Sequence, residues 1–108
     1  MTPEDQRAAA PARDAAAPTP PQVTIRLPRS LRALFPGCPA EVGVAAATVV
    51  AAIDALDAAI PGIRPRILDA GPSIRAHLNL FVDGQPATLD TPLRGRSVLL
   101  VVPAVSGG

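Results

Sequence analysis

Lysine is absent from this sequence of 108 residues, and cysteine and histidine occur once each. The absence of lysine excludes Schiff-base chemistry and lysine general-base catalysis. A single cysteine excludes both a disulfide within the chain and a zinc site built from cysteines. Such sparing use of cysteine is typical of proteins that work in a reducing compartment.

Strong charge and long apolar runs are also missing. The net charge is +1, and the ten basic residues, all arginine, are scattered without an aromatic stacking series. We therefore expect no nucleic-acid partner. Residues 1–21 contain no continuous apolar stretch of the kind found in signal peptides, and no other run is long enough to span a membrane. A cytoplasmic protein that binds no membrane is expected.

Alanine and proline dominate residues 1–22, which end in Pro18-Thr19-Pro20-Pro21. A segment of this composition cannot bury enough apolar surface to offset its conformational entropy, so we interpret it as a disordered leader. The rest divides into a folded domain, residues 23–103, and a flexible tail, residues 104–108. A domain of this size supports one core that buries roughly 60% of the unfolded surface.

Two short strands open the folded domain. Residues 23–28 alternate apolar and polar side chains, which predicts a strand with one buried face. Residues 30–37 are predicted to form a loop with a short helical turn, and residues 40–44 a second strand antiparallel to the first. The side chains expected to point into the core are Val23, Ile25, Leu27, Leu31, Leu34 and Phe35.

A helix is predicted to follow, from Thr48 to Ile60. The hydroxyl of Thr48 is available to cap a free N–H of the first turn, and Pro61-Gly62 ends the helix. Asp54 and Asp57 lie near its solvent side. Its apolar residues form one stripe toward the core, because they recur with helical spacing. The stripe consists of Val49, Ile53, Leu56 and Ile60.

The second half of the domain begins with an irregular crossover over residues 63–76. Residues 78–82 are predicted to form a strand, which ends at the tight-turn signal Asp83-Gly84. Pro86 and Pro92 restrict the following segment to an edge strand and loops. The side chains expected to point inward are Leu78, Leu80 and Val82, with Leu89 and Leu93 as anchors in the loops.

The last strand is predicted at residues 98–103, which are apolar at every position. This pattern favours a central place in the sheet, and the strand ends at Pro103 because proline has no N–H to donate. The element order is strand, strand, helix, strand, short strand, strand. It describes an α+β protein in which a mixed sheet packs on one main helix. This is the β-grasp, or ubiquitin-like, fold.

One helix covers one face of a sheet, yet the last strand is apolar on both faces. If Leu99 and Val101 point toward the helix, the alternate residues point away from it. An apolar patch on that outer face marks an interface more often than an accident, so we predict that it docks a partner. The alternative is that the leader or a second copy of the chain covers it. The residues predicted to form the patch are Pro28, Phe81, Leu100 and Val102.

The sequence ends in Gly107-Gly108. Two residues without a Cβ pass through a slot too narrow for side chains. The one reactive group that such a tail delivers is the α-carboxylate of Gly108. A carboxylate becomes an electrophile when another enzyme converts it into a mixed anhydride, for example an acyl-adenylate formed with ATP. We therefore predict that Gly108 is the working residue; the alternative is a frayed terminus.

Six segments carry a family resemblance: IRLPRSLRAL, ATVVAAIDAL, IPGIRPRILD, LNLFVDGQ, LDTPL and, above all, PAVSGG. They resemble the MoaD/ThiS sulfur carriers, which include the small subunit of molybdopterin synthase, and the resemblance covers residues 23–108. The terminal segment is specific in this context, whereas the others are individually weak. The resemblance agrees with the β-grasp fold.

The resemblance implies a carrier that is not itself an enzyme and binds no cofactor or metal. Gly108 is then adenylated by an E1-like enzyme that uses ATP, and is converted into a thiocarboxylate, while Gly107 gives access. The sulfur passes to an accepting enzyme, such as the large subunit of molybdopterin synthase or a cysteine synthase. The outer sheet face contacts these partners together with Pro103, Ala104, Val105 and Ser106.

One departure from the family concerns charge. Members commonly have an acidic turn before the last strand, whereas this chain has Arg94-Gly95-Arg96-Ser97. Reversing the charge changes which partner surface is electrostatically compatible. The long crossover at residues 63–76 is closer to the molybdopterin-type and cysteine-biosynthesis-type members than to the thiamine-type ones.

Two other classes of function stay open. A ubiquitin-like modifier would use the same tail to join Gly108 to lysines of target proteins. A non-covalent interaction subunit of β-grasp fold would not need the glycines.

The single cysteine and the single histidine give little support for a catalytic site. Cys38 is interpreted as an incidental thiol, and His77 as a residue at the start of a strand. Asp54 and Asp57 are not interpreted as a catalytic pair.

Overall fold

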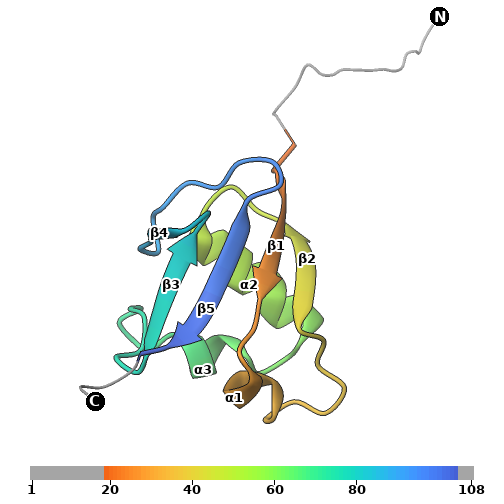
Figure 1. Ribbon diagram of the computed structural model, residues 1–108, viewed down its shortest axis with the longest axis vertical. Helices are drawn as coiled ribbons and strands as arrows, with labels where there is room; N and C mark the ends of the chain where they lie inside the picture. The colour runs from red at the N-terminus through yellow and green to blue at the C-terminus, as the bar shows by residue number, and fades with distance from the viewer. Residues whose placement is uncertain (1–18, 105–108) are drawn as a thin grey trace, which may run out of the picture.

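The computed structural model describes residues 19–104. They form a five-stranded sheet, and the long helix α2 crosses its rear face in Figure 1. Among these residues, no helix combines the length and the apolar character needed to cross a membrane. The elements are β1 (Gln22–Arg26), α1 (Arg29–Arg32), β2 (Glu41–Ala45), α2 (Val49–Ala59), α3 (Arg64–Ile67), β3 (Leu78–Val82), β4 (Gln85–Pro86) and β5 (Val98–Pro103).

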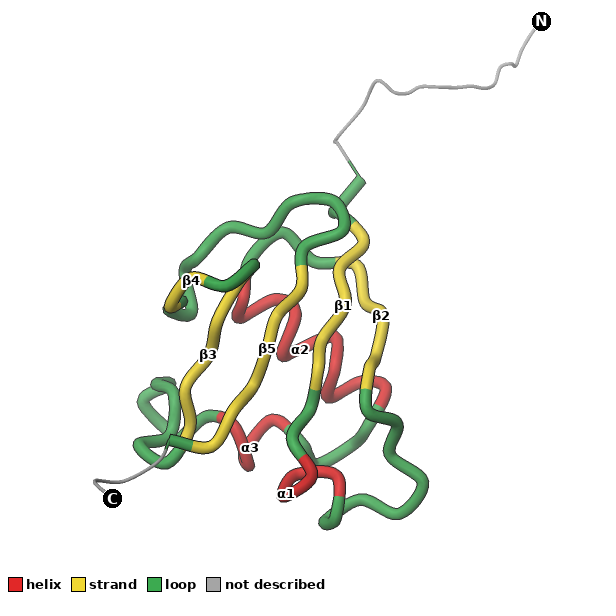
Figure 2. Tube along the Cα trace, in the orientation of Figure 1, coloured by secondary structure: helices red, strands yellow, loops and turns green. Residues whose placement is uncertain are grey.

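The strand order is β2-β1-β5-β3-β4, so the last strand of the chain lies in the middle of the sheet (Figure 2). β5 pairs in parallel with β1 and antiparallel with β3, and the two remaining pairs are antiparallel. A mixed sheet of this order with one long helix across one face is the β-grasp fold. The fold class and the central position of the last strand are therefore confirmed.

The first two strands are each displaced from their predicted bounds. β1 begins at Gln22 and ends at Arg26, before the predicted end at Pro28. The Leu27 N–H still donates to the Ala40 carbonyl at 2.9 Å, but the Pro28 carbonyl accepts from Leu31 and Arg32 and so begins α1. β2 starts and ends one residue later than predicted. The errors lie at the ends of the strands, where single hydrogen bonds continue the ladder past the last paired residues of β1 and β2.

Helix α2 begins at Val49, directly after the predicted N-cap Thr48, whose hydroxyl accepts a hydrogen bond from the Ala51 N–H at 3.3 Å. Val49, Ile53 and Leu56 of the predicted stripe are fully buried. The helix ends at Ala59, and Gly62 then adopts a φ of +97°, a conformation that favours glycine.

The carboxylate of Asp57 has a structural role that the sequence did not reveal. Its Oδ1 atom accepts from the backbone N–H groups of Gly62 and Arg64, at 3.1 and 2.9 Å. These bonds fix the turn between α2 and α3. Asp54, one helical turn earlier, is exposed and pairs with the Arg64 guanidinium at 2.7 Å.

The crossover at residues 63–76 is more regular than predicted. It contains the short helix α3, which buries Ile67 in the core. After it, Oδ1 of Asp69 accepts from the Ser73 hydroxyl at 2.7 Å and from the N–H groups of Gly71 and Ser73 at 3.0 Å. The sequence-based prediction was wrong here because proline at the start of a helix supports the first turn instead of preventing it.

Strand β3 matches its predicted bounds, and the turn after it has positive φ at both Asp83 and Gly84. The Asp83 carboxylate accepts from the Ser97 hydroxyl at 2.9 Å and from the Val98 N–H at 2.8 Å. The Ser97 hydroxyl also accepts from the Arg94 N–H at 3.0 Å. Asp83 therefore joins the end of β3 to the start of β5.

The core lies between the sheet and α2, with contributions from α1 and α3. Nearly all side chains predicted to point inward are buried or packed against the core. Leu34 is the exception, because its side chain is 49% exposed after the end of α1. The buried apolar residues are Val23, Ile25, Leu27, Leu31, Val44, Ala46, Val49, Ala52, Ile53, Leu56, Ile63, Ile67, Leu68, Leu78, Leu80, Val82, Leu93, Leu99 and Val101.

Replacing Ser97 with alanine should lower the free energy of unfolding by about 1–2 kcal/mol, because the Arg94 N–H and the Asp83 carboxylate each lose a partner. Chemical denaturation measures the change. Ser30→Ala, at an exposed serine of α1, is the control. An equal effect of the two substitutions would contradict a structural role for the Ser97 hydroxyl.

The stability contribution of Asp69 should depend on pH. The Ser73 hydroxyl, followed by the Gly71 N–H, holds the pKa of Asp69 below its ordinary value. A lowered pKa stabilises the fold above the pKa of the unfolded chain, and this contribution is lost as the pH falls through the folded pKa. Asp69→Asn should therefore be less stable than the parent at neutral pH.

The difference between Asp69→Asn and the parent should begin to shrink below about pH 4, where the aspartate of the unfolded chain takes up its proton. It should vanish only below the lowered pKa of the folded state, where the folded parent is neutral at this position as well. Denaturation midpoints measured from neutral to acid pH test this. A difference that stays constant with pH would contradict the assignment.

Candidate partner interface on the outer sheet face

The alternation of side chains in β5 gives the sheet two apolar faces. Leu99 and Val101 are 0% and 1% exposed and face α2. Leu100 and Val102 are half-buried and face the opposite side. The predicted inward and outward phases of this strand are therefore confirmed.

A row of paired residues runs across the outer face. Pro86 of β4 pairs with Phe81 of β3, and Phe81 pairs with Leu100 of β5. Beyond Leu100 the row continues to Arg26 of β1 and then Glu41 of β2. Paired residues share a face of the sheet, so the row changes from apolar to charged at its middle.

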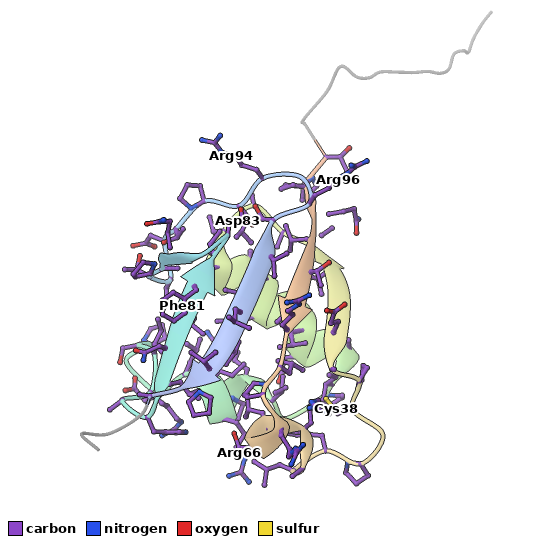
Figure 3. The ribbon with its side chains drawn as sticks, viewed as in Figure 1. Cys38, Arg66, Phe81, Asp83, Arg94 and Arg96 are labelled. Carbon is purple, nitrogen blue, oxygen red and sulfur yellow. The ribbon has the colours of Figure 1, made fainter. Side chains whose placement is uncertain are left out.

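We define the outer patch as Phe81, Pro86, Val98, Leu100 and Val102. Figure 3 shows Phe81 on the side of the sheet that faces the viewer, over β3. Val98 and Pro86 extend the predicted patch. The sequence signal for Val98 is its place in the same alternation as Leu100, whereas Pro86 joins the patch only through its pairing with Phe81. The patch covers the β4-β3-β5 half of the sheet.

Pro28 lies beyond the end of β1 and is half-buried. Its backbone is extended, at φ −74° and ψ 157°. Arg26 pairs with Leu100, so extending the parallel register by two residues brings Pro28 opposite Val102. The pairing itself ends at Arg26, and Pro28 directly precedes α1 as its N-cap.

The tail leaves the domain where β5 ends. Pro103 is exposed and pairs with Leu78 at the start of β3. The Ala104 N–H donates to the His77 carbonyl at 2.7 Å, which continues the ladder by one residue. The predicted site residues Val105, Ser106, Gly107 and Gly108 lie outside the described residues.

A cleft of about 330 Å³ opens beside the start of β3, close to this exit. Arg66, Arg75 and His77 line it, which makes the tail end of the domain basic. The Arg75 Nε–H donates to the Pro65 carbonyl at 2.7 Å and is thereby held in place. Leu34, which was expected in the core, also lines this cleft.

The turn with reversed charge lies at the other end of the sheet. Arg94 and Arg96 precede β5, whereas the tail follows it, and Figure 3 shows the two arginines at the end opposite Arg66. The six residues of β5 separate the two regions by roughly 20 Å, at about 3.3 Å per residue. The departure from the family turn therefore lies away from the tail exit.

The two single reactive side chains, Cys38 and His77, line different clefts. Cys38 is half-buried, and its thiol lies 3.5 Å from the Pro39 carbonyl. His77 is exposed at the start of β3, as predicted. Within residues 19–104, histidine, cysteine, aspartate and glutamate side chains do not gather in groups of three that could hold a metal ion.

Sequence comparison decides the family, because the model of the ThiS family matches residues 27–108. The chain belongs to the ThiS family. Its small ubiquitin-like members are sulfur carriers or modifiers, and such proteins are generally not enzymes themselves. No curated protein matches the chain.

Solved structures agree with the ThiS family assignment. A chain of the Amycolatopsis orientalis BexX/CysO complex is 27% identical with a TM-score of 0.71, covering 80% of this chain and 99% of that one. SAMP1 from Haloferax volcanii is 30% identical with a TM-score of 0.67, covering 81% and 99%. Mycobacterium tuberculosis CysO is 27% identical with a TM-score of 0.69, covering 77% and 99%.

Proposed function

We propose that this ThiS-family protein is a sulfur carrier that works through the α-carboxylate of Gly108. A carboxylate oxygen attacks the α-phosphorus of ATP on an E1-like enzyme, and pyrophosphate leaves. Hydrosulfide then attacks the carbonyl carbon of the adenylate and forms a C–S bond, while the bond to AMP breaks and a proton is released. The product is a thiocarboxylate, which donates its sulfur in biosynthesis of the molybdopterin or cysteine type.

The family match through residue 108 is the observation that carries this proposal. It includes the Gly-Gly end together with the strand that precedes it. The strand is the central one, paired on both sides, so the domain gives the tail a rigid base. The similarity to two CysO structures favours a sulfur carrier over a non-covalent interaction subunit.

The outer patch is the surface that we assign to the partner enzymes. It lies on the face of β5 that α2 does not cover, and the same strand leads directly into the tail. A partner that docks on Leu100 and Val102 thereby also aligns the tail. ATP belongs to the partner's active site, and this chain contributes the carboxylate.

A second candidate function is protein modification. The 30% identical neighbour SAMP1 is described as a small archaeal modifier protein. A modifier would use the same adenylate, but a lysine amine of a target protein would attack the carbonyl carbon and release AMP. An isopeptide bond to Gly108 would replace the thiocarboxylate.

The C-terminal peptide should gain sulfur when the protein is incubated with its adenylating enzyme, ATP and a sulfide source. High-resolution mass spectrometry of that peptide should locate one oxygen-to-sulfur exchange at Gly108. Fragment ions are needed because oxidation of Met1 or Cys38 nominally resembles this exchange in the intact mass. A variant without Gly107 and Gly108 is the control.

An unmodified Gly108, measured while the enzyme modifies a control carrier, would overturn the sulfur-carrier proposal. Conjugates joined through Gly108 to lysines in a cell lysate would instead favour the modifier.

Replacing Phe81 and Val102 with aspartate should abolish adenylation, because two charges then lie in a surface that must be desolvated on docking. The fold should persist, since both side chains belong to the outer face. Pyrophosphate release measures adenylation, and circular dichroism checks the fold. Ala58→Asp on the exposed side of α2 is the matched control. Undiminished adenylation of the folded double variant would contradict the docking role.

A further inference from the structure

The edge of the sheet at β2 presents unpaired backbone groups. The Leu27 N–H donates to Ala40, and the Ala46 N–H donates to Pro21, both at 2.9 Å. Residues bonded to the neighbouring strand alternate along an antiparallel ladder. Even-numbered residues of β2 therefore bond to β1. The N–H and C=O groups of Glu41, Gly43 and Ala45 point away from the sheet, and no described residue pairs with them.

The two edge strands of the sheet differ in how well they are protected from pairing with another strand. β4, at the far edge, has two residues and one of them is Pro86, so it offers little backbone for pairing. β2 has five residues, without proline or lysine. Proteins usually protect a long edge strand with charges, proline, a bulge or a covering segment. Figure 2 shows β2 along the outside of the sheet.

The exposed edge of β2 is complementary to itself. In an antiparallel pair of two copies centred on Gly43, Gly43 faces Gly43 and Glu41 faces Ala45. Each of these facing pairs exchanges both of its N–H···O=C bonds, because all three residues direct their backbone groups outward. Glu41 meets no like charge, and its carboxylate stays paired with Arg26 at 2.8 Å.

The side chains on the two faces of β2 favour the same register. On the outer face, Gly43 and Ala45 are small and exposed, so their side chains leave room for a second strand. On the helix side, Val42 of one copy lies opposite Val44 of the other. Residues in such non-hydrogen-bonded pairs approach closely, with about 4.5 Å between Cα atoms. Val42 is only half-buried in the single chain and would be covered.

We infer that β2 pairs antiparallel with β2 of a second copy of this chain, around a two-fold axis at Gly43. The two sheets join into one, and the two-fold axis is perpendicular to it. One short strand pair buries less surface than the roughly 1,200 Å² of a stable interface, so the dimer is weak and depends on concentration.

The dimer leaves the proposed carrier site free. β2 is at the opposite edge of the sheet from β3 and β4, and β1 separates it from β5. Both outer patches face the same side of the joined sheet, and in each copy β1 separates the strand that leads to the tail from the junction. The inference does not depend on the sulfur chemistry, so each can fail while the other stands.

Sedimentation equilibrium of the full chain, over roughly 10 μM to 1 mM, measures the association. We expect a reversible monomer–dimer equilibrium. A full chain that stays monomeric over this range would overturn the inference. If such a chain dimerises only after residues 1–18 are removed, the inference also fails, because the leader would then be what covers the edge of β2.

A charge exchange at Gly43 tests the register itself. A Cβ at this position meets only the Val23 carbonyl, at 4.0 Å, so Gly43→Lys and Gly43→Glu should both fold. Each substitution places like charges opposite each other at the two-fold axis and should weaken self-association up to about fivefold. An equal mixture of the two variants should recover the affinity of the parent.

Gln85→Lys places the same charge on the other edge strand and should leave the dimer unchanged. A dimer that survives both Gly43 variants would overturn the inference. The inference would also be overturned if Phe81→Asp abolished the dimer while Gly43→Lys retained it. That result would assign the interface to the outer patch. Failure of the mixture to associate would exclude the symmetric register.

Discussion

The structure depends on the pairing of β5 on both of its edges. β5 is the last strand of the chain, yet it fills the space between β1, the first strand, and β3, and its inward side chains Leu99 and Val101 complete the core under α2. Asp83 sets where the strand begins, since its carboxylate accepts from Ser97 and Val98. The position of the tail and the composition of the outer patch both follow from this placement.

The sequence predicted those features of the fold that depend on the short-range periodicity of its apolar residues. The phase of β5 follows from the two-residue repeat of a strand, and the burial of Val49, Ile53 and Leu56 follows from the helical repeat. The hydrogen bond from the Ser97 hydroxyl to the Asp83 carboxylate was not predictable, because fourteen positions separate the two residues and pairing in space joins them. Nor could the pattern show which backbone groups of β2 point outward, since this depends on the register with β1.

The outer face of the sheet is divided between two kinds of surface. The β4-β3-β5 half is apolar and adjoins the tail exit, whereas the β1-β2 half carries the Arg26–Glu41 ion pair and small residues. The arginines follow a similar division, with Arg94 and Arg96 at one end of β5 and Arg66 and Arg75 at the other. A partner that binds the tail thus contacts the apolar outer patch and the positive charge of Arg66 and Arg75 together. This holds independently of the basic turn at Arg94 and Arg96.

The parallel pairing of β1 and β5 has a mechanical consequence. The chain enters the pair at one end, through Gln22, and leaves it at the other, through Ala104 (Figure 1). Tension between the two ends of the chain therefore loads the hydrogen bonds between these strands together, in shear, instead of opening them one at a time. Through β3, the same strand is anchored on its second edge. A pull on the segment that follows Pro103 is thus shared by the ladders on both edges of β5.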